Sequence, residues 1–127
     1  MTKENIKLKL NSENEWTIFI GNRWIDSGKN TKFVAFLPIL EVLLDNSIEL
    51  LNELSALANE EQINFLIKKN LRTALVSESV YWIEMAIRYI IEQNYPNKDF
   101  ISYLSLYKYD KRLPQKLRQK MGNVSDR

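Results

Sequence analysis

Hydrophobic side chains occupy every second position in the first part of the chain. Apolar residues alternate with lysines between positions 6 and 10, and Trp16 begins a second alternating run that ends at Ile20. A period of two places the apolar side chains on one face of a strand. Gly21-Asn22 is typical of a tight turn and leads into a third short strand, Arg23 to Ile25, before a loop over residues 26–30. These runs predict a β-hairpin or a three-strand meander over residues 1–30.

From about residue 31 the hydrophobic period becomes helical. Pro38 suits the first turn of a helix, because its missing N–H needs no partner there, and leucines continue the apolar face as far as Leu57. The sequence Asn46-Ser47-Ile48-Glu49 has the form of a capping box. Two alternatives therefore stand: one continuous helix, or a helix that ends near residue 45 and a second that starts at residue 47. Asn59-Glu60-Glu61-Gln62 is another capping box and predicts a further helix.

The remaining residues predict three more helices. The stretch 77–79 separates the preceding helix from one over about 80–94, which Pro96 ends. Asn97 is placed to cap a shorter helix through Tyr107, and the last helix starts at Asp110 or at 113–114 and stops at Gly122. The predicted fold is α+β and mainly α, a single domain over residues 1–127. A β-hairpin region (1–30) is followed by a compact bundle of four to six helices (31–122) and a frayed tail (123–127).

The chain contains no histidine and no cysteine among its 127 residues. It therefore lacks an imidazole base, a thiolate nucleophile, a disulfide and the usual ligands of zinc, copper and haem. Carboxylates alone can hold Mg²⁺, but a helical Mg²⁺-dependent nucleotide hydrolase would place Glu-x-x-Glu pairs on adjacent helices, and the sequence has no such pair. We expect a non-enzymatic protein with no catalytic residues, no cofactor and no metal, and keep the hydrolase as the weakest alternative.

No segment of the sequence predicts a membrane span. The longest uncharged apolar run, Phe33 to Leu40, is eight residues long, whereas roughly 20 are needed to cross a bilayer. The first five residues are polar and mixed in charge, unlike a secretory signal. We therefore expect a cytoplasmic protein that has no membrane partner.

Charge is distributed unevenly along the sequence, although the net charge is only +2. Residues 33–67 contain six acids and no Lys or Arg, whereas residues 108–127 contain seven bases and two acids. Four of the acids, Glu41, Asp45, Glu49 and Glu53, recur at intervals of four residues. On one continuous helix they would form a single stripe about 18 Å long, in which neighbouring like charges repel.

Three interpretations of this acidic row remain open. It is the solvated face of an amphipathic helix, or the basic C-terminal helix neutralises it, or it attracts a basic protein partner. In the third case we predict that the four acids steer the partner and that Trp24, at an exposed turn with Arg23, anchors it. Trp16, in phase with the apolar strand positions, is predicted to lie in the core. The most concrete form of this hypothesis is a toxin-neutralising immunity protein that blocks the cationic cleft of a nuclease.

A nucleic-acid-binding regulator is the alternative from a different class. Its contacts would come from the basic C-terminal residues, by neutralising phosphates and stacking bases on nearby tyrosines. Tyr103 and Tyr107 share a helical face with apolar residues, so we expect these two rings in the core instead. The candidate contacts are Lys108, Lys111, Arg112, Lys116, Arg118 and Lys120.

Overall fold

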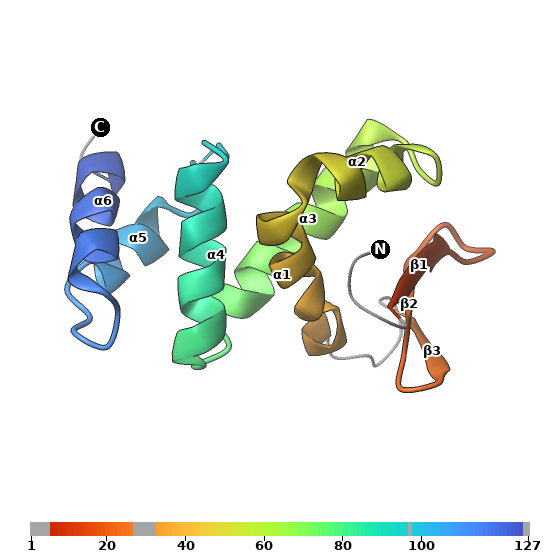
Figure 1. Cartoon of the computed structure of the whole chain (residues 1–127), viewed down its shortest axis with the longest axis horizontal. Helices are drawn as coiled ribbons and strands as arrows, with labels where there is room; N and C mark the ends of the chain where they lie inside the picture. Colours follow the sequence, from red (N-terminus) through yellow and green to blue (C-terminus); the bar gives the residue numbers. More distant parts are fainter. Residues whose placement is uncertain (1–5, 27–32, 97, 126–127) are drawn as a thin grey trace. The chain divides into compact units, whose positions relative to one another are not determined.

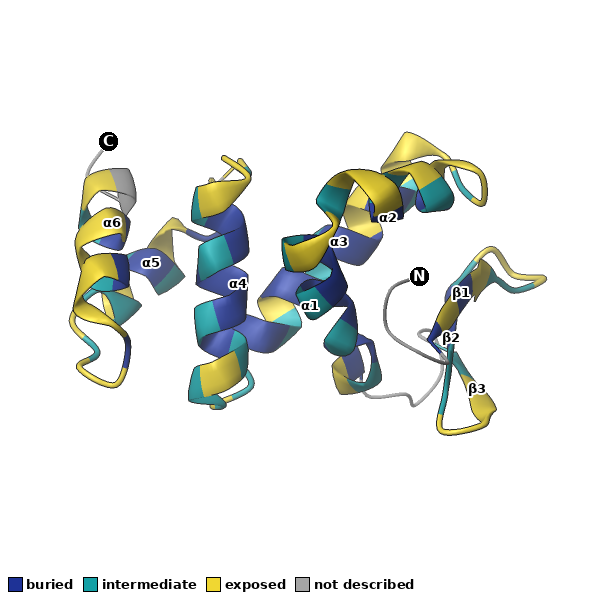
Figure 2. Ribbon diagram, viewed as in Figure 1, coloured by how far each residue is buried: buried dark blue, intermediate teal, exposed yellow. Residues whose placement is uncertain are grey.

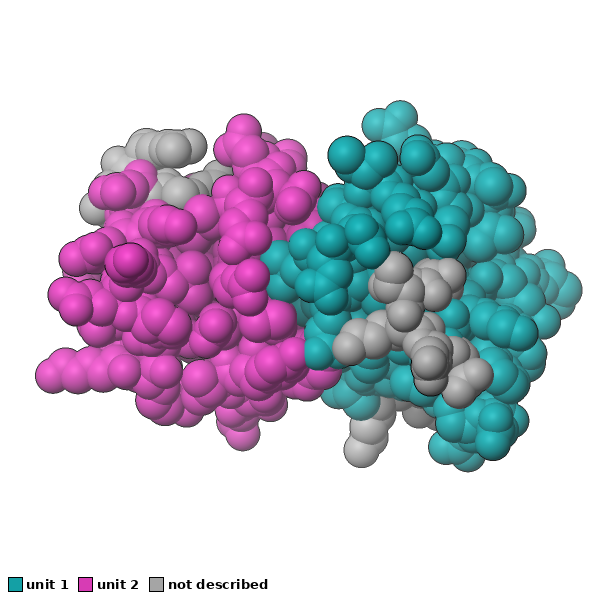
Figure 3. Space-filling view, in the orientation of Figure 1, with its two compact units in different colours: residues 1–73 teal, residues 74–127 magenta. Residues whose placement is uncertain are grey.

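The computed structural model describes residues 6–26, 33–96 and 98–125, with residues 124 and 125 described by their backbone alone. The chain divides into two compact units, residues 1–73 (unit 1) and residues 74–127 (unit 2) (Figure 3). The predicted loop at 27–30, the predicted cap Asn97 and the last two residues of the predicted tail lie outside the described residues. That the whole chain acts as one domain stays a prediction.

Unit 1 begins with a three-stranded antiparallel sheet in the order β1–β2–β3 (Figure 1). The strands β1 (Lys7–Leu10), β2 (Trp16–Ile20) and β3 (Arg23–Asp26) follow the alternating runs, which confirms the predicted meander. Leu8 pairs with Ile18, and Ile18 pairs with Ile25, so these apolar side chains share one face. Gly21 and Asn22 both have positive φ, 61° and 65°, as a two-residue type I′ hairpin turn requires.

The helical part of unit 1 contains η1 (Phe33–Phe36), α1 (Pro38–Asp45), α2 (Ser47–Ser55) and most of α3 (Glu60–Leu75). Asn46 leaves the helical conformation, with φ −146° and ψ 60°, so the chain adopts the alternative with two helices. The Asn46 side chain makes no capping hydrogen bond, and the first predicted capping box therefore does not form.

The capping box predicted at the start of α3 does form. Asn59 Oδ1 accepts from the Gln62 N–H at 2.8 Å, and Gln62 Oε1 accepts from the Asn59 N–H at 2.9 Å. Each side chain satisfies a backbone donor that the first helical turn leaves without an intrahelical partner. This reciprocal pair fixes where α3 begins.

Two long-range hydrogen bonds connect α3 to the rest of unit 1. The indole N–H of Trp16 donates to the Gln62 carbonyl at 2.9 Å, which ties the sheet to the first turn of α3. Asn70 Nδ2 donates to the Phe36 carbonyl at 2.8 Å, which ties the middle of α3 to η1. The core around these bonds is apolar. Its largest fully buried side chains are Trp16, Ile18, Phe36, Ile39, Leu40, Leu43, Leu50, Leu54, Leu66 and Leu71.

Unit 2 contains the end of α3 followed by α4 (Val80–Glu92), α5 (Ile101–Tyr107) and α6 (Gln115–Ser125). The Ser79 hydroxyl caps α4 by accepting from the Trp82 N–H at 3.3 Å. Helix α6 packs against both α4 and α5. Buried apolar residues line the inner sides of these helices (Figure 2).

Helix α6 continues past Gly122 to Ser125, so the predicted end at Gly122 is wrong. A glycine ends a helix by taking the left-handed conformation. Gly122 does not have a positive φ, and a Cβ added there would meet nothing within 4 Å apart from the adjacent backbone of its own helix. The residue therefore sits in α6 as an ordinary helical position.

The architecture confirms the α+β, mainly α class, with the sheet at the N-terminal end and the helices after it. Within residues 6–26, 33–96 and 98–125, no helix combines the length and the apolar character that crossing a membrane requires.

Candidate functional site

The four acids of the predicted row lie on two helices. Glu41 and Asp45 belong to α1, whereas Glu49 and Glu53 belong to α2, and the break at Asn46 separates the two pairs. The acids therefore do not form the single stripe that a continuous helix would give. Their spacing of four residues places side chains on one face only within each helix.

Four acids of this region are exposed: Asp45 and Glu49 from the row, and Glu60 and Glu61 from the first turn of α3. Among the residues that the structure describes, none of these four makes an ion pair. No Lys or Arg occurs between residues 33 and 67 to provide one locally. Glu49, Glu60 and Glu61 lie in first helical turns, where the helix dipole favours negative charge. We call these four residues the exposed acids.

Trp24 lies on the outer face of the sheet and is 42% exposed, as the sequence predicts. Its ring is 5.3 Å from that of Phe19, and Lys9 Nζ lies 4.1 Å from its ring centre. Lys7 Nζ lies over Phe19 on the same face. The structure therefore places two lysines beside the Phe19–Trp24 pair on the sheet, whereas the acidic row lies on α1 and α2.

Among the basic residues predicted to contact nucleic acid, Arg112 is paired with an acid of the same segment. Arg112 Nη2 lies 2.6 Å from Asp110 Oδ2, and its Nε donates to both Asp110 oxygens. These hydrogen bonds lower the pKa of Asp110 from 3.8 to about 2 and raise the pKa of Arg112. Arg118 Nε donates to the Leu113 carbonyl at 3.2 Å. Both arginines are thus held by local partners.

Most lysines of this segment are exposed, and so is one of its aromatic rings. Lys111, Lys116 and Lys120 are exposed, and Lys108 Nζ lies 5.3 Å from the ring centre of Tyr109. Tyr109 is 75% exposed.

The two tyrosines predicted for the core are both half-buried. The hydroxyl of Tyr107 donates to the Leu75 carbonyl at 2.6 Å. Burial is the main cause that raises the pKa of the Tyr107 hydroxyl. The Tyr107 hydroxyl thus helps to hold α5 to the end of α3 within unit 2. Because stacking on nucleic acid uses several exposed rings, Tyr109 alone makes a small platform.

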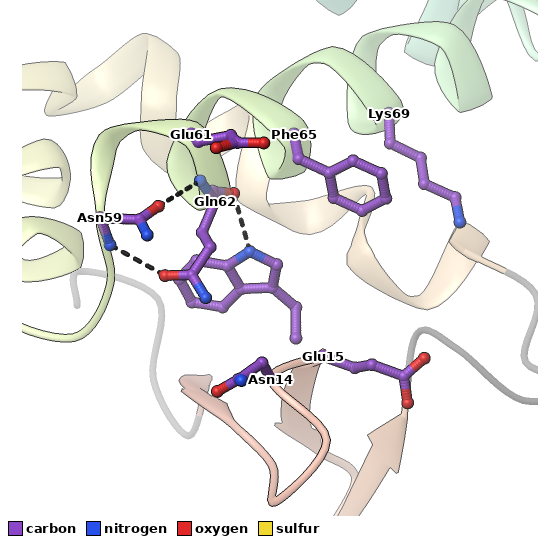
Figure 4. Close-up of a pocket in the computed structure, with 8 residues that line it drawn as sticks. Asn14, Glu15, Asn59, Glu61, Gln62, Phe65 and Lys69 are labelled. Atoms are coloured by element: carbon purple, nitrogen blue, oxygen red, sulfur yellow. Dashed lines mark hydrogen bonds between the residues drawn. The ribbon is translucent and has the colours of Figure 1, made fainter.

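A pocket of about 640 Å³ lies in unit 1, between the β1–β2 turn and the first half of α3 (Figure 4). Its lining combines carboxylates, amides, one ammonium and two aromatic rings. The lining residues are Asn14, Glu15, Trp16, Asn59, Glu61, Gln62, Phe65 and Lys69. No pattern in the sequence predicts this pocket.

One face of α3 forms a wall of the pocket. Glu61, Phe65 and Lys69 follow at intervals of four residues and therefore share that face. Phe65 is 54% exposed, although it is a large apolar side chain. Lys69 Nζ lies 5.5 Å from the Phe65 ring centre and 5.0 Å from that of Phe33. The ring of Phe65 is therefore already in contact with a cation.

Glu15 precedes Trp16 in the chain and lies across the pocket from this wall (Figure 4). Its Oε1 atom is buried and has no hydrogen-bond partner. Buried polar atoms are nearly always paired, so this carboxylate keeps an unused acceptor, which a ligand donor reaches when the Glu15 side chain turns toward the pocket. The spacing of residues 61, 65 and 69 is visible in the sequence. The approach of Glu15 to this face of α3 depends on tertiary structure and is not.

Another charged pair lies outside these regions, on α4. Arg88 pairs with Glu92 at 3.1 Å rather than with Glu84, the partner that its helical spacing also allows. In the described part of the chain, no three acidic side chains are grouped as metal ligands require. No protein-family model, curated protein or solved structure matches the chain.

Proposed function

We propose that this chain is a non-enzymatic protein-binding protein whose partner presents a basic surface. The observation that supports the proposal is the set of exposed acids, Asp45, Glu49, Glu60 and Glu61, which make no ion pair among the described residues. They belong to a segment without any base, so a basic partner supplies the charge that the segment lacks. Such complementarity favours one class of partner over others.

Electrostatic steering acts mainly on association. A surface that concentrates one sign of charge raises the rate of encounter with an oppositely charged partner by about 10 to 10³-fold, less so as salt increases. Affinity then depends on a few buried anchors, most often aromatic. Phe65 fits this role because it is exposed beside Glu61. Trp24 remains a second candidate anchor, although Lys7 and Lys9 beside it repel a basic partner.

The most concrete form of the proposal is a toxin-neutralising immunity protein that acts in the cytoplasm. A nuclease binds phosphates through Lys and Arg, so its substrate cleft is cationic. A protein with acids of its own can occupy that cleft in place of nucleic acid and prevent cleavage. This role needs no catalytic group, metal or cofactor on the inhibitor.

A pair of charge reversals tests the proposal without disturbing the fold. Asp45 ends α1 and Glu49 lies in the first turn of α2, so Asp45→Lys is favourable for the helix dipole and Glu49→Lys unfavourable by a similar amount. The double variant D45K/E49K should therefore be as stable as the wild type. The matched control is E78K/E84K in unit 2, which changes the net charge equally.

The partner is first captured from the source cells on the immobilised wild-type chain and purified, and its Kd is then measured for each variant. At low salt we expect D45K/E49K to bind about tenfold or more weakly, since both reversals oppose a basic surface. The control should bind within about twofold of the wild type. Equal affinity of D45K/E49K and wild type, or capture of nucleic acid in place of a basic protein, would contradict the proposal.

A further inference from the structure

We infer that the pocket between the β1–β2 turn and α3 binds a guanidinium group, supplied by an arginine side chain of the partner. The source of the arginine rests on the function proposed above. The chemistry of the pocket rests on its own residues, all of which belong to unit 1.

The charge of the lining favours a cation. Two acids, Glu15 and Glu61, face one base, Lys69, so the lining has a net charge of −1 (two negative charges and one positive). None of these three side chains makes an ion pair among the described residues. A cation that enters the pocket therefore meets two carboxylates that have no ion-pair partner in the described part of the chain.

The unpartnered oxygen of Glu15 favours a donor with several N–H groups. Glu15 Oε1 is buried and accepts no hydrogen bond, whereas the second oxygen of the same carboxylate is not buried in this way. A guanidinium presents five N–H donors in a planar fork, and it binds carboxylates through two parallel hydrogen bonds. It therefore supplies the missing donor and engages the second oxygen at the same time.

The aromatic wall distinguishes a guanidinium from an ammonium. Phe65 presents an exposed ring to the pocket, and Lys69 Nζ lies 5.5 Å from its centre, within the distance of a cation–π contact. A planar guanidinium stacks on such a ring, whereas a lysine ammonium offers only a point charge. We therefore expect arginine to bind more tightly than lysine.

The size of the cavity fits a side chain together with part of its backbone. At about 640 Å³ it is within the range of small-ligand pockets, larger than one arginine side chain requires. The side-chain amide groups of Asn59 and Gln62 line the same cavity, and only their oxygens are used in the capping box. Their NH₂ groups remain to bind the carbonyl oxygens of the segment that carries the arginine.

The test uses the full chain and a defined probe, N-acetyl-arginine methylamide, followed by NMR of backbone and indole N–H groups. We expect saturable shifts at Glu61, Phe65 and the Trp16 indole, with a Kd of about 1–10 mM, as the ligand efficiency of a small fragment gives. The citrulline analogue has the same shape without the charge, and should bind at least about tenfold more weakly because charge-assisted hydrogen bonds are lost. The lysine analogue should lie between the two.

Two substitutions locate the binding group. Glu15→Gln should weaken arginine binding about tenfold, whereas Glu13→Gln in the same turn should leave it unchanged. Because Glu15 Oε1 makes no hydrogen bond in the fold, Glu15→Gln should also leave the melting temperature unchanged, which a structural role would not allow. Phe65→Leu keeps an apolar side chain at an exposed position and should weaken arginine binding severalfold by removing the ring.

Equal binding of the arginine and citrulline analogues would overturn the inference, as would saturable shifts at other residues, an absence of saturable binding, or a Glu15→Gln variant that binds normally. Tighter binding of N-acetyl-aspartate methylamide would assign the pocket to an acidic ligand through Lys69 instead.

D45K/E49K should bind the arginine probe as the wild type does. An arginine pocket without any basic protein partner would therefore refute the proposed function alone.

Discussion

The acidic segment, residues 33–67, and the basic segment, residues 108–125, both concentrate charge of one sign, but they differ in how much of it is neutralised within the chain. The basic segment contains Asp110, which binds Arg112 through several hydrogen bonds, and Arg118 donates to a backbone carbonyl. The acidic segment contains no base at all, and its exposed acids make no ion pair among the described residues. The number of charged residues in a segment therefore does not predict the electrostatic field that a partner meets. That field depends on how many of the charges form ion pairs within the chain.

The largest expected effect concerns the bond that holds the sheet against the start of α3, where two of the exposed acids lie. Trp16 is 2% exposed and donates to the Gln62 carbonyl. We expect Trp16→Ala to lower the free energy of unfolding by about 3–5 kcal/mol, as for other large-to-small core substitutions. Urea unfolding followed by circular dichroism measures it. A loss below about 1 kcal/mol would mean that Trp16 does not support unit 1.

A carboxylate placed in the core of unit 1 should lower the stability of the fold, unlike the exposed acids of the same unit, which face water. Asn70 is fully buried, with Nδ2 bonded to the Phe36 carbonyl and Oδ1 unpartnered. Asn70→Asp replaces the donor by a buried carboxylate and should cost about 3 kcal/mol or more at pH 7. Burial raises the pKa of such a carboxyl, so the loss should shrink as pH falls and the neutral acid donates to Phe36. Equal losses at pH 7 and pH 4 would contradict this account.

The internal pairing of the basic segment predicts an acid-sensitive unit 2. The pKa of Asp110 is lowered from 3.8 to about 2 by Arg112, so the stabilisation is complete above the unfolded pKa and disappears as pH falls through the folded one. We expect the melting temperature of the wild type to fall more steeply between about pH 4 and pH 2 than that of Asp110→Asn. Thermal melts across this range provide the comparison. Parallel pH profiles would show that the pair contributes nothing to stability.

The smallest expected effect tests the course of α6. Gly122 is helical without a positive φ, so Gly122→Ala should raise the free energy of unfolding by about 0.4–1 kcal/mol. Gly21→Ala is the contrasting control, because the φ of +61° at Gly21 makes a side chain unfavourable and should lower stability. A loss of stability for Gly122→Ala would place the end of α6 at Gly122 after all.

Local signals in the sequence were enough for most of the fold. The alternating runs gave the strands, and the reciprocal pair Asn59 and Gln62 gave the start of α3, because both depend on residues close together in the chain. The break at Asn46 stayed open, since it depends on backbone geometry without a side-chain cap. The predicted end of the last helix at Gly122 is wrong because a glycine near a helix end can terminate the helix but does not have to.

The candidate sites were less predictable than the fold. The spacing of the acids is visible in the sequence, but it does not decide their division between α1 and α2. The lysines beside Trp24 follow from strand register. The pocket forms where the turn at Glu15 approaches Phe65 on α3, and the sequence carries no signal for that approach. The hydrogen bond from the Trp16 indole to the Gln62 carbonyl helps to hold these regions together.

The most direct test of the central claim is the association rate constant for the purified basic partner, measured against salt concentration for the wild type and for D45K/E49K. We predict that the wild-type rate falls steeply between about 50 and 500 mM salt, because the Debye length shortens, and that D45K/E49K associates slowly with little salt dependence. Identical slopes for the two proteins would contradict the claim that the exposed acids steer the partner.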